Sequence, residues 1–219
     1  MRWTRLTILA LAASFLASPH SHATVIGAAY LNNAANTDAV IGFPHGAPDV
    51  TFLVPSPTNA ACTGIFAGDT LCFDSTATIN AYTLGGFLAT GGVTVVTGTS
   101  AALSAPLNST VFEFTGTVTV TDGQTFQAGH DDGLQMQIGS ALVINAPGPT
   151  SFTTTPVTYT GPTGTFAFDL VYGECCGPPA FLGVSLPLIT PAPEPMSIAL
   201  LGSALVGLAG TRYLRRAPT

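Results

Sequence analysis

Two adjacent aspartates, Asp131 and Asp132, are the residues of this sequence whose types and spacing point most directly to chemistry. They lie in the stretch HDDGLQMQI, residues 130–138, where the glycine predicts a tight turn between strands. Two carboxylates about 4 Å apart repel by roughly 1 kcal/mol in water and by about 4 kcal/mol at an effective dielectric of about 20. In a partly buried turn, one pKa therefore rises unless a cation holds both charges.

Basic side chains are missing from the part of the chain around this pair. The five that exist lie at the two ends and are Arg2, Arg5, Arg212, Arg215 and Arg216. Residues 24–190 hold ten acidic residues, and only His45 and His130 could carry a positive charge there. Compensation for the aspartates must come from water, from His130 or from a metal ion, and carboxylate oxygens favour Ca²⁺. The same acidity excludes nucleic acid, whose binding depends on Lys and Arg.

Alternating apolar and polar residues predict an all-β fold for the middle of the chain. One face of residues 111–121 carries Phe112, Phe114, Val118 and Val120. Further strands are expected at 50–54, 77–84, 93–97, 124–128, 134–138, 141–145, 152–159, 165–172 and 181–186. The pair Asp122-Gly123 predicts a two-residue hairpin, and Gly139-Ser140 predicts another turn. Strands at this spacing indicate an antiparallel β-sandwich that is jelly-roll-like.

The two ends of the chain have the composition of targeting segments. Residues 1–23 place two arginines before an apolar run and end in a small-residue pattern, which predicts a cleaved secretory signal peptide. The alternative is an uncleaved anchor, although the apolar run is shorter than the roughly 20 residues that span a bilayer. Residues 191–219 combine a proline-rich linker with an uncharged apolar stretch at 196–211 and three arginines, which predicts a C-terminal transmembrane helix. The secreted domain is then 24–190.

The C-terminal tail resembles the PEP-CTERM sorting signal of Gram-negative bacteria. The resemblance rests on Pro193, Glu194 and Pro195, followed by the apolar stretch and the terminal arginines. It implies export through signal peptidase, a transient inner-membrane intermediate, and removal of the tail by an exosortase. The protein would then reach the cell surface or the extracellular matrix and contribute to a biofilm. An ordinary single-pass anchor is the alternative.

Four cysteines in an exported chain predict disulfides. Cys62 and Cys72 bracket a short loop and could staple it. Cys175 and Cys176 are neighbours, so either a vicinal bridge or two links to the other pair is allowed. The spacing lacks the C-x-x-C pairs of a structural zinc site.

A second resemblance begins at the aspartate pair. The order of FQAGHDDGLQMQIGSALVI and the later TFAFDLVYGE is similar to the protective-antigen-type β-sandwich, a family that includes flocculin-type lectins. The resemblance implies that Asp131 and Asp132, joined by a cis peptide, bind Ca²⁺ that holds sugar hydroxyls. Aspartates also favour turns by bonding local backbone amides, so a purely structural turn is the alternative.

Other polar and aromatic residues are secondary candidates. His130 could add a hydrogen bond beside the turn or be an exposed loop histidine. Glu174 could contact a sugar or metal, or be a solvated loop carboxylate. The only Trp is Trp3 in the signal peptide, so stacking against a glycan would need a Tyr or Phe. The tyrosines that could serve are Tyr30, Tyr82, Tyr159 and Tyr172.

These observations predict a surface or matrix protein that binds exopolysaccharide or another glycan with the help of Ca²⁺. The alternative is a structural matrix component with no small-molecule site. An enzyme is not expected, because the sequence has no G-x-S-x-G elbow and no H-E-x-x-H motif. Adjacent aspartates are also a poor source of the carboxylate separation of about 5 to 9.5 Å that glycoside hydrolysis needs.

Overall fold

The computed structural model describes residues 25–31, 38–54, 62, 64–66, 71–76 and 82–188. The predicted signal peptide and the sorting tail, with Pro193, Glu194 and Pro195, lie outside these residues and stay predictions. Within the described part of the chain, no helix combines the length and the apolar character needed to cross a membrane.

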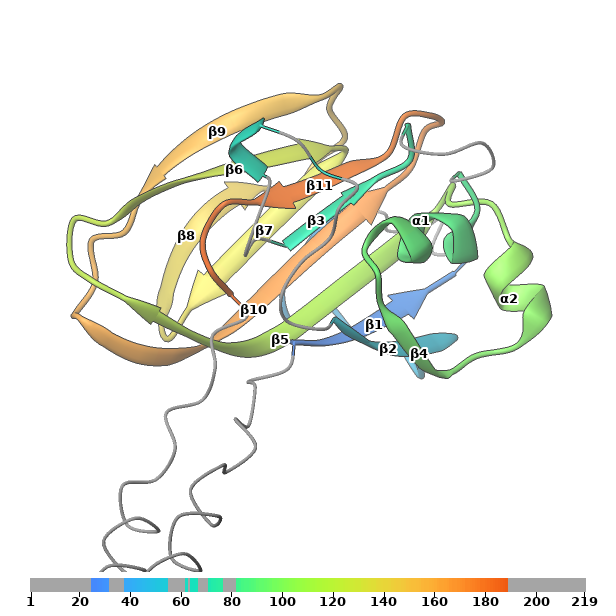
Figure 1. Ribbon diagram of the computed structural model, residues 1–219, viewed down its shortest axis with the longest axis horizontal. Coiled ribbons are helices and arrows are strands. Elements are labelled where there is room, and N and C mark those ends of the chain that lie inside the picture. The colour runs from blue at the N-terminus through green and yellow to red at the C-terminus, as the bar shows by residue number, and fades with distance from the viewer. Residues whose placement is uncertain are drawn as a thin grey trace, which may run out of the picture. The chain divides into compact units, whose positions relative to one another are not determined.

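Two antiparallel sheets form the sandwich that the alternation predicted (Figure 1). The larger sheet has seven strands in the order β4-β2-β1-β5-β10-β7-β8, and the smaller has four in the order β3-β11-β6-β9. The strands are β1 (Val25–Tyr30), β2 (Val50–Val54), β3 (Leu71–Asp74), β4 (Thr94–Thr97), β5 (Thr110–Val120), β6 (Thr125–Asp131), β7 (Gly133–Ile138), β8 (Ala141–Ala146), β9 (Thr153–Thr158), β10 (Gly164–Glu174) and β11 (Phe181–Val184). All their pairings are antiparallel.

Apolar side chains from both sheets fill the space between them. Phe112 and Phe114 of β5 join Phe126 of β6 and Leu182 of β11 in one buried cluster. The central strands β5 and β10 pair along their whole lengths, from Gly164 opposite Val120 to Glu174 opposite Thr110. This long pairing fixes which end of β10 meets the end of β6, and it therefore positions the candidate site.

No helix was predicted within residues 24–190, yet the described part of this domain has a 3₁₀ turn, η1 (Gly64–Phe66), and two short α-helices, α1 (Leu84–Thr90) and α2 (Ser100–Ser104). The predicted strand at 77–84 is wrong at its described end, where Leu84 begins α1. Leu84, Phe87 and Leu88 are buried at i, i+3 and i+4, which is helical rather than strand spacing. The Thr83 side chain caps this helix by accepting a hydrogen bond from the Gly86 amide at 3.2 Å.

Two of the predicted turns have a different role from the one expected. Asp122-Gly123 connects β5 of the larger sheet to β6 of the smaller sheet, so the predicted hairpin there is wrong. The aspartate pair likewise lies where the chain passes from β6 to β7, which belong to different sheets. Only Gly139-Ser140 joins two strands that pair with each other, β7 and β8. A turn signal marks a change of direction, whereas strand pairing is decided by which apolar faces must be buried.

Candidate functional site

The aspartate pair occupies the crossing between the two sheets. Asp131 ends β6, where it pairs with Phe181 of β11, and the peptide bond between Asp131 and Asp132 is cis. Gly133 begins β7 and pairs with Gly173 of β10. A Cβ atom at Gly133 would lie 2.1 Å from the Pro147 carbonyl oxygen, so the glycine is needed for a close backbone approach. The DDG sequence therefore encodes a packed crossing between layers.

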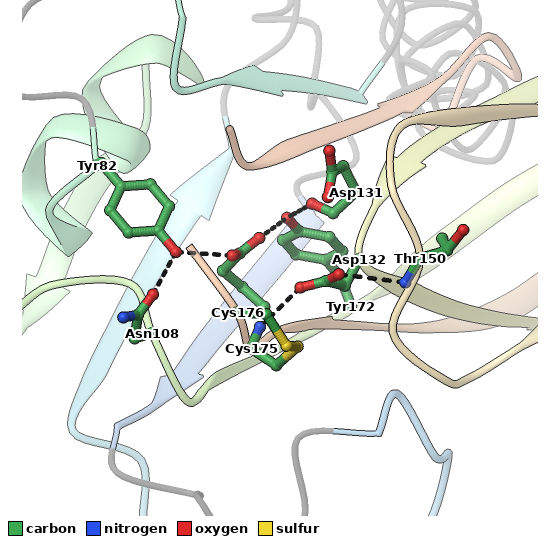
Figure 2. Close-up of a disulfide and its surroundings, with 9 residues drawn as sticks. Tyr82, Asn108, Asp131, Asp132, Thr150, Tyr172, Cys175 and Cys176 are labelled. Atoms are coloured by element: carbon green, nitrogen blue, oxygen red, sulfur yellow. Dashed lines mark hydrogen bonds between the residues drawn. A yellow bond between two sulfur atoms is a disulfide. The ribbon is translucent and has the colours of Figure 1, made fainter. Parts of the chain in front are cut away.

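The Asp132 carboxylate is held by backbone amides from two other segments (Figure 2). Its Oδ1 accepts a hydrogen bond from the Thr150 amide at 3.2 Å, and its Oδ2 accepts one from the Cys175 amide at 2.9 Å. The residue is only 7% exposed. Each oxygen retains a further lone pair after one such bond, so the carboxylate is oriented by the fold and can still ligate a cation.

Asp131 is equally buried, at 7% exposure. The backbone amide of Phe152 donates to its carboxylate, and its carbonyl oxygen accepts a hydrogen bond from the Tyr172 hydroxyl. Burial and the adjacent charge of Asp132 raise the pKa of the Asp131 carboxyl, and the Phe152 amide and His130 oppose that rise. Holding both carboxylates charged at this position is therefore costly.

His130 is not the exposed loop histidine that was the alternative in the sequence reading, because it is only 1% exposed. On β6 it follows Phe126 and Ala128 at intervals of two, so it shares their core-facing side. Its Nδ1 lies 2.5 Å from the Asp132 carbonyl oxygen, which can only accept, so Nδ1 carries the proton. Its Nε2 is buried and has no hydrogen-bond partner. His130 thus stabilises the crossing from the core side through its hydrogen bond to the Asp132 carbonyl oxygen.

Glu174 is not the solvated loop carboxylate that was one of its two predicted alternatives. It is the last residue of β10 and is 0% exposed. Its Oε1 lies 2.8 Å from the Tyr82 hydroxyl and its Oε2 lies 2.9 Å from the Tyr172 hydroxyl. The signal was available in the sequence, because Glu174 continues the alternation of Phe168, Leu170 and Tyr172 on the buried face.

Two tyrosine hydroxyls donate hydrogen bonds to Glu174, Tyr82 to Oε1 and Tyr172 to Oε2, and the Tyr172 hydroxyl also contacts the Asp131 carbonyl oxygen. Burial raises the pKa of Glu174 to about 8. The two tyrosine hydrogen bonds oppose this rise, and the charges of Asp132 and Asp131 add to it. A pKa of about 8 keeps most of the Glu174 carboxyl protonated at pH 7.

The aspartates at this crossing offer oxygen donors of the type that a hard divalent cation prefers. Asp131 and Asp132 supply carboxylate oxygens, and residues 24–190 contain no Lys or Arg that could neutralise them. Ca²⁺ takes six to eight oxygen ligands, including backbone carbonyls and water, so two aspartates would form part of its shell. Glu174 accepts hydrogen bonds from Tyr82 and Tyr172 and is 0% exposed, so it is more deeply buried than the two aspartates.

The cysteines form the bridges Cys62–Cys72 and Cys175–Cys176, which selects one of the three connectivities that the sequence left open. The Sγ atoms of Cys175 and Cys176 lie within 4.8 Å of a carboxylate oxygen of Asp132 and of each other. Because both sulfurs are oxidised, neither is a thiolate ligand. The vicinal bridge is a neighbour of the candidate cation site and does not belong to its ligand shell.

The tyrosines proposed for glycan stacking are not available for it. Tyr30, Tyr159 and Tyr172 are buried, and the half-buried Tyr82 directs its hydroxyl to Glu174. The exposed aromatic side chain next to the aspartate pair is Phe152, which is 52% exposed. No sequence signal identified it, because it precedes β9 in a stretch of threonines and prolines.

A second acidic group, on the central strands β5 and β10, is separate from this crossing. Glu113 of β5 accepts a hydrogen bond from the Tyr30 hydroxyl at 3.0 Å. Burial and the charge of Glu113 raise the pKa of Asp169 on β10 to about 6. Asp169 Oδ1 and both ring nitrogens of His45 are shielded and have no hydrogen-bond partner. Because the pKa of Asp169 is raised, this group contributes to the pH dependence of folding stability.

The chain matches no protein-family model and no curated protein sequence. Among solved structures it is similar to a "PA14 sugar-binding domain from RTX adhesin", with 18% identity and a TM-score of 0.49 over 74% of this chain and 87% of that one. It is also similar to the "PA14 domain of MpAFP Antifreeze protein", with 18% identity and a TM-score of 0.49 over 73% of this chain and 78% of that one. Similarities of this size assign no ligand to the present chain.

Proposed function

We propose that this domain binds a calcium ion through Asp131 and Asp132 and uses the ion to hold hydroxyl groups of a glycan. The observation that carries the proposal is the burial of two adjacent carboxylates, each 7% exposed, in a domain without Lys or Arg. Unpaired charges are expensive to bury, whereas a bound divalent cation compensates both at once. Free coordination positions on such an ion suit the paired hydroxyls of a sugar.

The proposal includes an exported protein that acts by adhesion at the cell surface or in the extracellular matrix. Its support is the targeting composition of residues 1–23 and 191–219 together with two disulfides, which form and persist in oxidising compartments. Immunoblotting of cell, membrane and medium fractions tests the sorting step. A form that keeps its tail in the inner membrane contradicts release by an exosortase.

A structural matrix component without a ligand is the second candidate, and one observation favours it. Both oxygens of Asp132 accept backbone hydrogen bonds, from Thr150 and Cys175, which is how an aspartate stabilises a crossing without any metal. The carboxylate of Asp131 also accepts one, from Phe152. As a purely structural element, the pair would order the β8–β9 and β10–β11 connections and bind nothing.

Calcium titration followed by thermal melting separates the two candidates. A ligand that binds only the folded state stabilises it by about 2.7 kcal/mol at 100 times its Kd. We expect the wild-type protein to melt at higher temperature with Ca²⁺ than with an equal ionic strength of NaCl, and the Asp131→Asn/Asp132→Asn variant to show no such rise. An Asp38→Asn/Asp49→Asn variant removes two charges from exposed positions and is the matched control. Equal shifts in all three proteins would indicate charge screening and favour the structural component.

A further inference from the structure

The outer face of the larger sheet, which is turned away from the core, is covered at one end by the segment 38–46. Ala39 of this segment packs in a small buried cluster with Val171 on the outer face of β10. The His45 ring lies 5.0 Å from the Tyr30 ring, which belongs to the last residue of β1. The segment therefore shields this face where β1 ends.

The other end of β1 lies in an open, apolar corner of the same face. Ile26 of β1 pairs with Leu53 of β2, and Leu53 pairs with Thr94 of β4. Paired residues of antiparallel strands point to the same side of a sheet, so these three side chains share one face. Ile26 is 55% exposed and Leu53 is 36% exposed, whereas Val25, the neighbour of Ile26 that points the other way, is buried. We call Ile26, Leu53 and Thr94 the outer-face patch.

The outer-face patch lies in an uncharged part of a strongly acidic domain. The strands β1, β2 and β4, which lie side by side at one edge of the sheet (Figure 1), contain no Asp, Glu, Lys, Arg or His. The sequence from residue 75 to residue 112 contains none either. Along the row of paired residues, Asp169 is the acid on the side of Ile26, and Thr115 of β5 lies between them.

This distribution of charge favours a second copy of the chain as the partner. Residues 24–190 hold ten acidic residues and no Lys or Arg, so two copies repel each other wherever their acidic surfaces meet. They can approach closely only through an uncharged surface. A basic partner would instead be attracted to the acidic surfaces. An exposed apolar group on an uncharged face is therefore suited to self-association.

We propose that the outer-face patch is a homodimer interface, in which the patch of one copy packs against the same patch of a second copy about a two-fold axis. Such an interface uses identical residues on both sides, and apolar sheet faces pack at a spacing of about 10 Å. Strands β5 and β10 separate β1 from β7, so the interface does not overlap the aspartate crossing. The dimer would present two crossings, and a ligand that repeats along a polymer would be held with higher avidity.

The test is cross-linking of the full chain in the cells that express it. All four cysteines form disulfides, so Ile26→Cys introduces a single reactive thiol on the patch. Two copies with different epitope tags are expressed together, treated with a short bismaleimide and blotted for both tags. We expect a two-chain product that carries both tags. Ala167→Cys, at an exposed position of β10 on the same face but outside the patch, is the matched control and should give little product.

An added charge tests whether the patch itself holds the copies together. Thr94→Asp changes an exposed side chain and leaves the core intact, but it places like charges in the proposed interface. In the Ile26→Cys background it is expected to reduce the two-tag product about tenfold, which corresponds to about 1.4 kcal/mol. Thr119→Asp adds the same charge at an exposed position of β5 outside the patch and should leave the product unchanged.

The outcomes separate a dimer from collision and from other partners. A two-tag product from Ile26→Cys that Thr94→Asp removes and Thr119→Asp retains supports the inference. The inference is overturned if Ile26→Cys gives no two-tag product, if Ala167→Cys gives as much, or if both aspartate variants cross-link equally. A product that carries one tag and a different mass shows another protein on the patch, and it also overturns a homodimer. None of these results affects the calcium-induced melting shift, so the proposed function is tested separately.

Discussion

Replacing Glu174 with glutamine should remove a large part of the pH dependence of stability. The folded-state pKa of Glu174 is about 8 against an ordinary value of 4.5. A raised pKa means that the folded state keeps a proton that the unfolded chain releases. Its stabilisation is therefore fully present below about pH 4.5 and is lost as the pH rises to about 8. Each pKa unit is worth about 1.4 kcal/mol, so the loss reaches about 5 kcal/mol.

The glutamine side chain introduced by Glu174→Gln is neutral at every pH and keeps the same shape. Its amide oxygen can accept from the Tyr82 hydroxyl, and its amide nitrogen can donate to the Tyr172 oxygen in place of the hydrogen bond that Tyr172 gives to Glu174. We expect the variant to be within about 1 kcal/mol of the wild type at pH 5. At pH 8 it should be more stable by about 3 to 5 kcal/mol, a large fraction of the roughly 5 to 15 kcal/mol of an ordinary domain.

The assay is urea denaturation of both proteins from pH 5 to pH 8 in EDTA, so that no cation competes with the proton. The pKa of Asp131 is also raised, and that of Asp169 is raised to about 6. Both groups remain in the variant, so the difference between the two proteins isolates Glu174. Asp122→Asn, which removes a charge from an exposed turn, is the control and should keep the wild-type slope. Parallel stability curves for the wild type and Glu174→Gln would refute the protonated, buried carboxyl.

Three further outcomes follow from the same structure. Gly133→Ala should destabilise the domain by about 3 kcal/mol or prevent folding, because its Cβ would meet the Pro147 oxygen; near-wild-type urea denaturation would show that the crossing can relax. Cys62→Ser/Cys72→Ser should cost about 3 kcal/mol, since the bridge closes a loop with a sequence separation of 10, and a loss below about 1 kcal/mol in denaturation would contradict this. Calcium binding at pH 7 should release protons, because a cation beside Glu174 favours its charged form. Calorimetry in two buffers of different ionisation enthalpy measures the release, and identical heats would argue against it.

The strands of the second half of the domain could be predicted because their alternation survives in the fold. Residues 112, 114, 118 and 120 are buried as expected, and the strands after them lie within a few residues of their predicted bounds. The first half was harder to predict. There β1 and β3 are short and apolar on both faces. The apolar residues from Leu84 onward have helical spacing, but the strand-forming residues before them favoured a strand prediction. Alternation identifies a strand only where one face of it is polar.

The candidate site could be predicted in part. The aspartates were identified by counting charged residues. A chain segment without Lys or Arg offers the two carboxylates no basic side chain for an ion pair. Solvent exposure was an alternative for His130 and Glu174 because both stand beside turn and loop signals. The alternation along β6 and β10 buries both residues. The sequence carries no signal that Phe152 is exposed near the aspartates. Its exposure depends on how the tertiary structure places the ends of β9 and β11.

The sequence by itself therefore determined the all-β class, the strand faces, and the shortage of positive charge around Asp131 and Asp132. Tertiary structure alone decided that the DDG stretch crosses between two sheets, that Cys175 bonds to its neighbour Cys176, and that Tyr82 and Tyr172 are the partners of Glu174. The physical reason is that alternation and charge are local or additive properties of the chain. Sheet partners and hydrogen-bond partners are chosen by the burial of apolar faces across segments far apart in sequence.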